Sequence, residues 1–166
     1  MLQYIRSARS ASACDPGRPS ARRHYTALVA AAFLAAASAR GVERVLEVSA
    51  PATAAPGARI EVTVRARTDA GAGEHIGFLH VQYSADGGGT WTGLCFEQKI
   101  GTEATRKFSI TTGAEGSQTL VRARVAFRGG VAGDVDFRGA AISWQDDWQE
   151  WRQPPARWAT THVGAP

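Results

Sequence analysis

The stretch Tyr83-Ser84-Ala85-Asp86-Gly87-Gly88-Gly89-Thr90-Trp91 predicts the turn of a β-hairpin. Hydrophobic residues lead up to it over 76–83 and follow it over 91–96. The aspartate and the three glycines between them supply the backbone conformations, including positive φ angles, that a tight turn requires. We therefore expect the Asp86 carboxylate to bind turn amides and Trp91 to fold back onto the hairpin.

The turn also follows a recognisable spacing, Ser-x-Asp-x-Gly-x-Thr-Trp, filled by Ser84, Asp86, Gly88, Thr90 and Trp91. This spacing resembles the Asp-box of sialidase-type propellers, which also occurs in single copies in immunoglobulin-like sandwiches. The resemblance implies a structural role, because in the propellers these turns lie away from the active site. A single copy in a chain of 166 residues excludes a propeller of repeated blades.

Alternating hydrophobic and polar residues on both sides of the turn predict further strands. Within residues 58–68, the side chains of Ile60, Val62, Val64 and Ala66 point one way and polar side chains point the other, which is typical of a half-buried strand. By the same criterion we expect strands over residues 45–49, 58–68, 76–84, 90–98, 105–112 and 118–128, a short edge strand over 134–137 and a last strand over 157–163.

Short strands separated by turn residues predict an all-β fold, an antiparallel β-sandwich. The order of the strands between Val45 and Arg128 resembles that of immunoglobulin-like and fibronectin type III domains. The sandwich is expected to carry one short Trp-rich helix near its C-terminus. Trp144, Trp148 and Trp151 are spaced by four and three residues, which places the three indoles on one face of a helix.

The N-terminal segment has the pattern of a secretory signal peptide over residues 1–39. Arginines precede an alanine-rich apolar core that ends in the small-x-small sequence Ala37-Ser38-Ala39. Cleavage there leaves residues 40–166 as a single domain, secreted or periplasmic, by either the general or the twin-arginine route. The apolar core is shorter than the roughly 20 residues of a membrane-spanning helix, so we expect no membrane insertion after cleavage.

The charge balance gives no reason to expect a nucleic-acid partner. The whole chain has 19 basic and 15 acidic residues, and the predicted leader contains five of the basic residues and one acidic residue. The mature chain is then left with 14 of each and is formally neutral, so the high isoelectric point belongs to the leader.

The sequence contains no recognisable catalytic motif. It has no nucleophile elbow, phosphate-binding loop, dinucleotide fingerprint or paired cysteines, and Cys95 lies within a predicted strand as a core residue. The aspartates near the C-terminus do not match a calcium loop. We therefore predict no catalytic residue, no metal, no cofactor and no enzymatic activity.

One candidate ligand face follows from the predicted strand order. If the strands over 76–84, 118–128 and 157–163 are neighbours, one outer face carries His80, Arg122, Arg124, Trp158 and His162. Either the Trp-rich helix packs over it, or it is an open surface for an anionic or glycan ligand.

These features predict an exported binding or accessory module with a protein or glycan partner. One alternative is a carbohydrate-binding module that uses the C-terminal tryptophans. Another is a structural or dimerisation partner of an exported enzyme, since single Asp-boxes resemble those in the dimerisation domain of sulfite-oxidase-type molybdenum enzymes.

Overall fold

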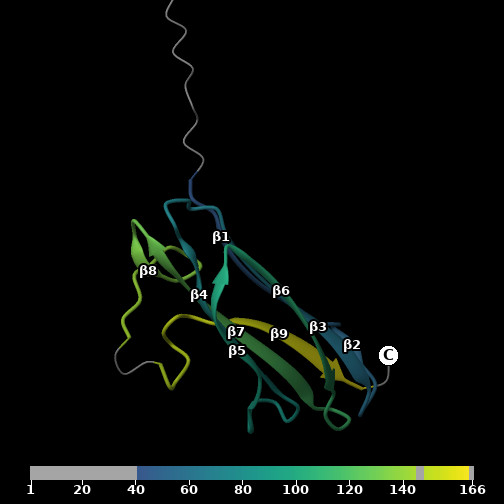
Figure 1. The fold of residues 1–166 in the computed structure, drawn as a ribbon. Coiled ribbons are helices and arrows are strands. Elements are labelled where there is room, and N and C mark those ends of the chain that lie inside the picture. The colour runs from purple at the N-terminus through teal and green to yellow at the C-terminus, as the bar shows by residue number, and fades with distance from the viewer. Residues whose placement is uncertain (1–40, 145–147, 165–166) are drawn as a thin grey trace, which may run out of the picture. The chain divides into compact units, whose positions relative to one another are not determined.

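The computed structural model describes residues 41–144 and 148–164, all within one compact unit, Ala39–Pro166. Nine strands in this part of the chain form two sheets, which confirms a β-rich, two-sheet architecture consistent with a sandwich. The two sheets are drawn as separate layers of arrows in Figure 1. The described residues contain no helix long and apolar enough to cross a membrane.

The smaller sheet is antiparallel and has the order β1-β3-β6. Its strands are β1 (Arg44–Ser49), β3 (Arg59–Thr68) and β6 (Glu103–Thr111). Strand β3 shows the predicted alternation, because Ile60, Val62, Val64 and Ala66 are buried.

The larger sheet has the order β2-β9-β7-β4-β5, and β8 pairs with β7 beside this path. Its strands are β2 (Thr53–Ala54), β4 (His75–Ser84), β5 (Thr92–Gly101), β7 (Gln118–Gly130), β8 (Gly133–Val135) and β9 (Arg157–Val163). The predicted adjacency of residues 76–84, 118–128 and 157–163 is confirmed, since β7 pairs with both β4 and β9.

The hydrophobic core lies between the two sheets. Apolar side chains from β1, β3 and β6 meet those from β4 and β7, and the buried set includes Val62, Val64, Leu79, Val125 and Phe127. Burial of this apolar surface is the main stabilising contribution to the fold.

The prediction of a purely antiparallel sandwich is wrong at one edge. Strand β2 runs parallel to β9, with Thr53 opposite His162 and Ala54 opposite Val163. The physical reason is the path of the chain after β1, which leaves the smaller sheet around Pro51 and joins the larger sheet beside its last strand. His162 N donates to Ala52 O at 2.9 Å and extends this pairing.

The predicted Trp-rich helix is also wrong, because no helix occurs in the part of the chain that the structure describes. Residues 145–147 of that prediction lie outside the described residues, while residues 148–151 form a turn. Trp151 has a φ of 62°, a left-handed conformation that cannot continue an α-helix and is unfavourable for a bulky side chain. The contacts that these tryptophans make with the sheet therefore determine the backbone conformation here, and the helical spacing of the tryptophans does not.

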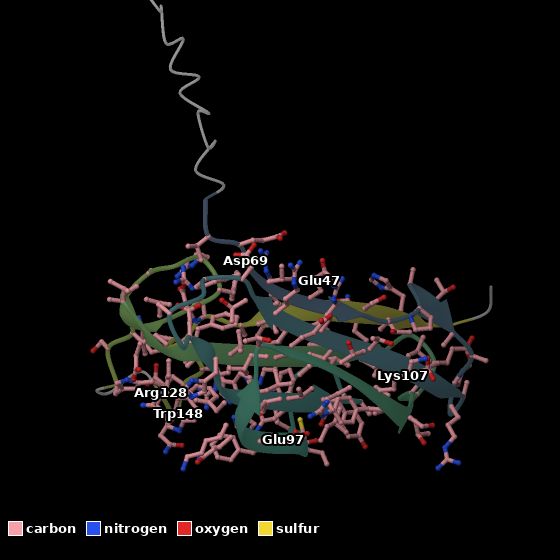
Figure 2. All side chains as sticks on the ribbon, turned by 45° about the horizontal axis from the view of Figure 1, so that its top comes forward. Glu47, Asp69, Glu97, Lys107, Arg128 and Trp148 are labelled. Carbon is pink, nitrogen blue, oxygen red and sulfur yellow. The ribbon has the colours of Figure 1, made fainter. Side chains whose placement is uncertain are left out.

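The outer face of the smaller sheet is a charged surface. Three ion pairs cross its strands: Arg65 with Glu103 at 3.4 Å, Lys107 with Glu61 at 3.0 Å, and Arg67 with Glu43, which precedes β1, at 3.5 Å. Figure 2 shows Glu47 and Trp148 on opposite sides of the ribbon. Trp148 therefore lies away from this charged surface.

Candidate functional site

The outer face of the larger sheet gathers arginines and tryptophans from several elements. Pairing of the strands places Arg122 opposite both Trp158 and Gln82, and Arg124 opposite His80. Residues 148–153, which lie between β8 and β9, pack over these residues and bring further indoles to them. We call the resulting surface the Arg–Trp face, and define it by Trp91, Arg122, Arg124, Trp148, Trp151 and Trp158.

Arg124 is the most unusual residue of this face, because its side chain is charged and only 2 % exposed. Its Nη1 donates to the carbonyls of Trp148 and Gln153, and its Nη2 lies 3.2 Å from His80 Nδ1. Its Nε is buried and has no hydrogen-bond partner within residues 41–144 and 148–164. Burial, and next to it the charge of Arg122, lowers the pKa of Arg124 to about 10. The group therefore stays cationic at neutral pH.

His80 is held beneath Trp151, with the two ring centroids 4.5 Å apart. Burial, followed by the charges of Arg124 and Arg122, lowers the pKa of His80 to about 4. The imidazole is therefore neutral at neutral pH, and its Nδ1 accepts a hydrogen bond from Arg124. His80 thus acts as an acceptor that partly satisfies the buried guanidinium.

Arg122 lies between aromatic rings at the more open end of the face. Its guanidinium carbon is 3.8 Å from the ring centroid of Trp91 and 4.2 Å from that of Trp151. Its Nε and Nη2 both donate to Gln82 Oε1, at 3.1 and 2.7 Å. Trp158 stands beside this group, 5.4 Å from Trp91 in an edge-to-face arrangement, and is 51 % exposed.

A second aromatic group occupies the other end of the same sheet face. Phe78 packs against Trp148 at 5.0 Å and Trp144 at 5.5 Å, and Phe96 lies 6.0 Å from Phe78. Trp144 Nε1 donates to Asp134 Oδ2 at 3.1 Å, which fixes the indole. Phe96 and Trp144 remain 52 % and 39 % exposed. Aromatic surface is therefore open to solvent at both ends of the face.

The turn over residues 84–91 has the hydrogen bonds expected of a structural device. Asp86 Oδ1 accepts from Ser84 Oγ at 2.6 Å and from Thr90 N at 2.9 Å, and Oδ2 accepts from Thr90 Oγ1 at 2.7 Å. These bonds, that from Ser84 foremost, hold the pKa of Asp86 well below its usual range. Gly88 has a φ of 102° and donates its N–H to Ser84 Oγ.

The turn also contributes directly to the Arg–Trp face. Trp91, the last residue of the turn, reaches beyond its own hairpin. Its ring stacks on the Arg122 guanidinium and contacts Trp158. Rigid turn bonds therefore position one of the indoles of the candidate site.

The structure brings together four of the five predicted ligand-face residues. Arg122 and Arg124 are neighbours on β7, His80 contacts Arg124, and Trp158 lies opposite Arg122. His162 does not join them, because it pairs with Gln118, four positions along the strand from Trp158. At about 3.3 Å per residue, this separation is roughly 13 Å.

Sequence reasoning assigned neither Trp91 nor Phe96 to this face. Counting along the predicted hairpin gave no signal for Phe96, because a register shift between Val81 and Gln82 is what places Phe96 opposite His80. Trp91 was accounted for by its turn motif alone, and only its stacking on Arg122 shows the second role.

The described residues offer no enclosed site for chemistry. Within residues 41–144 and 148–164, no pocket is formed and no three His, Cys, Asp or Glu side chains are grouped to hold a metal ion. Burial raises the pKa of Cys95 to about 11, so its thiol is protonated at neutral pH. What the arrangement provides is an open surface of aromatic rings and guanidinium donors.

Comparisons with known proteins identify no family for this chain. No family model matches it, and no curated protein matches it. Among solved structures, it is similar to superoxide reductase (neelaredoxin) from Ignicoccus hospitalis, with a TM-score of 0.46 and 10 % identity over 74 % of this chain and 82 % of that one. It is also similar to the sporulation control protein Spo0M from Bacillus subtilis, with a TM-score of 0.34 and 14 % identity over 75 % of this chain and 49 % of that one.

The first likeness corrects the prediction that the chain is not an enzyme. Superoxide reductase is an enzyme by its name. A TM-score of 0.46 assigns no reaction to this chain.

Proposed function

We propose that this chain is the binding module of an exported protein and that the Arg–Trp face binds a carbohydrate. The observation that carries the proposal is Trp158, which is 51 % exposed and held in place by Trp91 and Arg122. The proposal includes an immunoglobulin-like sandwich, an Asp-box turn at 84–91 and a cleaved leader over residues 1–39, with secretion or periplasmic location.

An exposed indole is suited to carbohydrate binding because its flat apolar surface complements the C–H face of a pyranose ring. An isolated exposed tryptophan loses conformational freedom when it binds, which reduces affinity. Here the Trp91 ring and the Arg122 guanidinium restrict the indole in advance. Arg122 and Gln82 also supply polar groups beside the ring.

The absence of a pocket among the described residues favours a polymer over a small molecule. Small ligands are usually bound in concave sites that bury most of their surface. A polysaccharide instead gains affinity from several sugar rings along a surface. Exposed Trp158 at one end of the sheet face and exposed Phe96 at the other offer two such positions.

Binding to a panel of neutral and acidic polysaccharides, measured by affinity electrophoresis and calorimetry, tests the proposal. We expect Trp158→Ala to weaken binding by about tenfold or more and Trp158→Phe to retain part of it. Val131→Ala is the matched control, because Val131 is apolar and 95 % exposed in the turn between β7 and β8. Equal binding by Trp158→Ala and the wild type, or no binding to any polysaccharide, would contradict the proposal.

A second candidate function is that of a partner subunit, and strand β5 favours it. This strand is the ten-residue edge of the larger sheet, and Phe96 projects from it with 52 % of its surface exposed. An edge strand of this length can pair with a strand of another protein. Light scattering of the purified protein, with Phe96→Lys as the disrupting variant, tests for self-association. A monomer at all concentrations would contradict pairing with a second copy.

A further inference from the structure

We propose that the Arg–Trp face selects acidic polysaccharides, with a carboxylate or sulfate bound at Arg122 and a sugar ring stacked on Trp158. This inference rests on the proposed carbohydrate-binding function and names the class of glycan.

The first support is an excess of positive charge on this face. Neither Arg122 nor Arg124 forms an ion pair with a carboxylate in the described part of the chain. Other arginines of the domain are paired: Arg44 with Glu74, Arg106 with Glu97, Arg128 with Asp134 and Arg138 with Asp136. Two adjacent, largely buried guanidiniums without a counter-charge among the described residues attract an anion.

The second support is a free donor group on Arg122. Its Nε and Nη2 share one acceptor, Gln82 Oε1, and Nη1 has no hydrogen-bond partner among the described residues. Among the described residues, Arg124 Nε is the only fully buried side-chain nitrogen or oxygen without a partner, so Arg122 Nη1 is not fully buried. A guanidinium N–H of this kind forms its strongest hydrogen bond with a charged oxygen.

The two arginines have different roles in this arrangement. Arg124 is almost completely buried and donates to the backbone of Trp148. It therefore contributes positive electrostatic potential to the face but no donor that a ligand can reach. Arg122 is half-buried, bears the free Nη1 and lies opposite exposed Trp158 in the sheet. One ligand residue can therefore place its ring on Trp158 and its anionic group at Arg122.

A glycan is a better match to this site than an acidic peptide because of the aromatic surface. The guanidinium carbon of Arg122 lies 5.7 Å from the ring centroid of Trp158, so the charge stands beside an exposed indole. In a uronic acid, the carboxylate projects from the same ring whose C–H face can stack on an indole. An acidic peptide supplies the charge without such a rigid ring.

The test compares ligands that differ only in charge. Polygalacturonate is compared with its fully methyl-esterified form, and dextran sulfate with dextran, by calorimetry at low and high salt. We expect the acidic member of at least one pair to bind about tenfold more tightly than its neutral counterpart, with affinity falling as salt rises. The two pairs distinguish a carboxylate from a sulfate as the recognised group.

Variants of Arg122 assign the selectivity to this residue. We expect Arg122→Gln to remove the preference for the acidic ligand. Arg122→Lys should retain only part of the preference, because the positive charge stays but the planar guanidinium, which can form two parallel hydrogen bonds, is lost. Arg65→Gln, on the outer face of the smaller sheet, is the control and is expected to bind like the wild type. Melting curves of all variants establish that they are folded.

The outcomes separate this inference from the proposed function. If acidic and neutral forms bind equally and only Trp158→Ala weakens binding, the charge selectivity is wrong and carbohydrate binding stands. If poly-glutamate binds as tightly as polygalacturonate, the ligand class is wrong. If none of the four polysaccharides binds to the folded protein while others of the panel do, only this inference is overturned; if no polysaccharide of the panel binds, both proposals are overturned.

Discussion

The guanidinium carbon of Arg124 lies 3.3 Å from the ring centroid of Trp148, and Nη1 of the same arginine donates to the Trp148 carbonyl. One buried side chain thus binds both the ring and the backbone of the segment that covers the larger sheet. It also donates to the carbonyl of Gln153, so it holds this segment at two points. The position of the covering segment therefore depends on a residue of β7.

Arg124→Met is expected to loosen the covering segment and to destabilise the domain by about 1–3 kcal/mol. Two carbonyls lose their donor, which costs about 1–3 kcal/mol for each buried group left unsatisfied. Removal of an unpaired buried charge offsets part of that cost. Urea unfolding measures the free energy, and acrylamide quenching of tryptophan fluorescence measures the exposure of the indoles.

The control for this change is Arg65→Met. Arg65 forms an exposed ion pair with Glu103 at 3.4 Å, and such a pair contributes less than about 1 kcal/mol. Quenching of Arg124→Met that equals that of the wild type would show that Arg124 does not hold the segment.

The domain is expected to lose stability on acidification through the protonation of His80. The pKa of His80 is about 4 in the folded protein against 6.5 for a free histidine, so the unfolded chain binds the proton first. The stabilising effect of the neutral imidazole is complete above pH 6.5 and decreases as pH falls towards 4, by about 2–3 kcal/mol at most. Unfolding free energies between pH 4 and pH 7 measure this slope.

His80→Asn is expected to flatten the slope over the same range, because the amide oxygen can accept the hydrogen bond of Arg124 without titrating. His162→Asn, an exposed histidine on the same sheet face, serves as the matched control. Identical slopes for His80→Asn and the wild type would exclude His80 as the acid-sensitive group.

Asp86→Ala is expected to lower the melting temperature by several degrees. The carboxylate accepts three hydrogen bonds, from Ser84 Oγ, Thr90 N and Thr90 Oγ1, and the alanine accepts none of them. Since the pKa of Asp86 is depressed in the folded state, its contribution is present above the ordinary aspartate pKa of about 4 and is lost as pH falls further. Calorimetric melting at pH 7 and pH 3 measures both effects.

Glu115→Ala, in an exposed turn, is the control for Asp86→Ala. The difference between the two variants should shrink at pH 3. A difference that stays constant with pH would mean that the charge of Asp86 does not matter.

Gly113→Ala is expected to destabilise the domain by about 1–3 kcal/mol or more. A Cβ at this position would overlap the carbonyl oxygen of Ala85 in the hairpin turn, and backbone cannot move aside as a flexible side chain can. Gly93→Ala is the matched change in β5, where a Cβ meets nothing within 4 Å. Its effect should be within about 0.5 kcal/mol. Equal melting of the two variants would show that the turn and residue 113 are not closely packed.

The strands and the hairpin could be predicted from local patterns of residues. A period of two in residues such as Ile60, Val62 and Val64 has only one way to bury its apolar side, so it specifies a strand and the face that enters the core. The hairpin turn is equally local, because Ser84, Asp86 and Thr90 form its hydrogen bonds within a few residues of one another. Local patterns of this kind need no knowledge of distant contacts.

The conformation and contacts of the C-terminal tryptophans depend on long-range packing and could not be predicted from local patterns. Helical spacing of Trp144, Trp148 and Trp151 is a weak preference, whereas the bonds from Arg124 to two carbonyls and the stacking on two arginines exist only after β7 is in place. The same holds for the parallel pairing of Thr53 with His162, which joins residues more than a hundred positions apart. Such contacts carry no local signal in the sequence, because their energy is gained only when distant segments meet on the folded sheet.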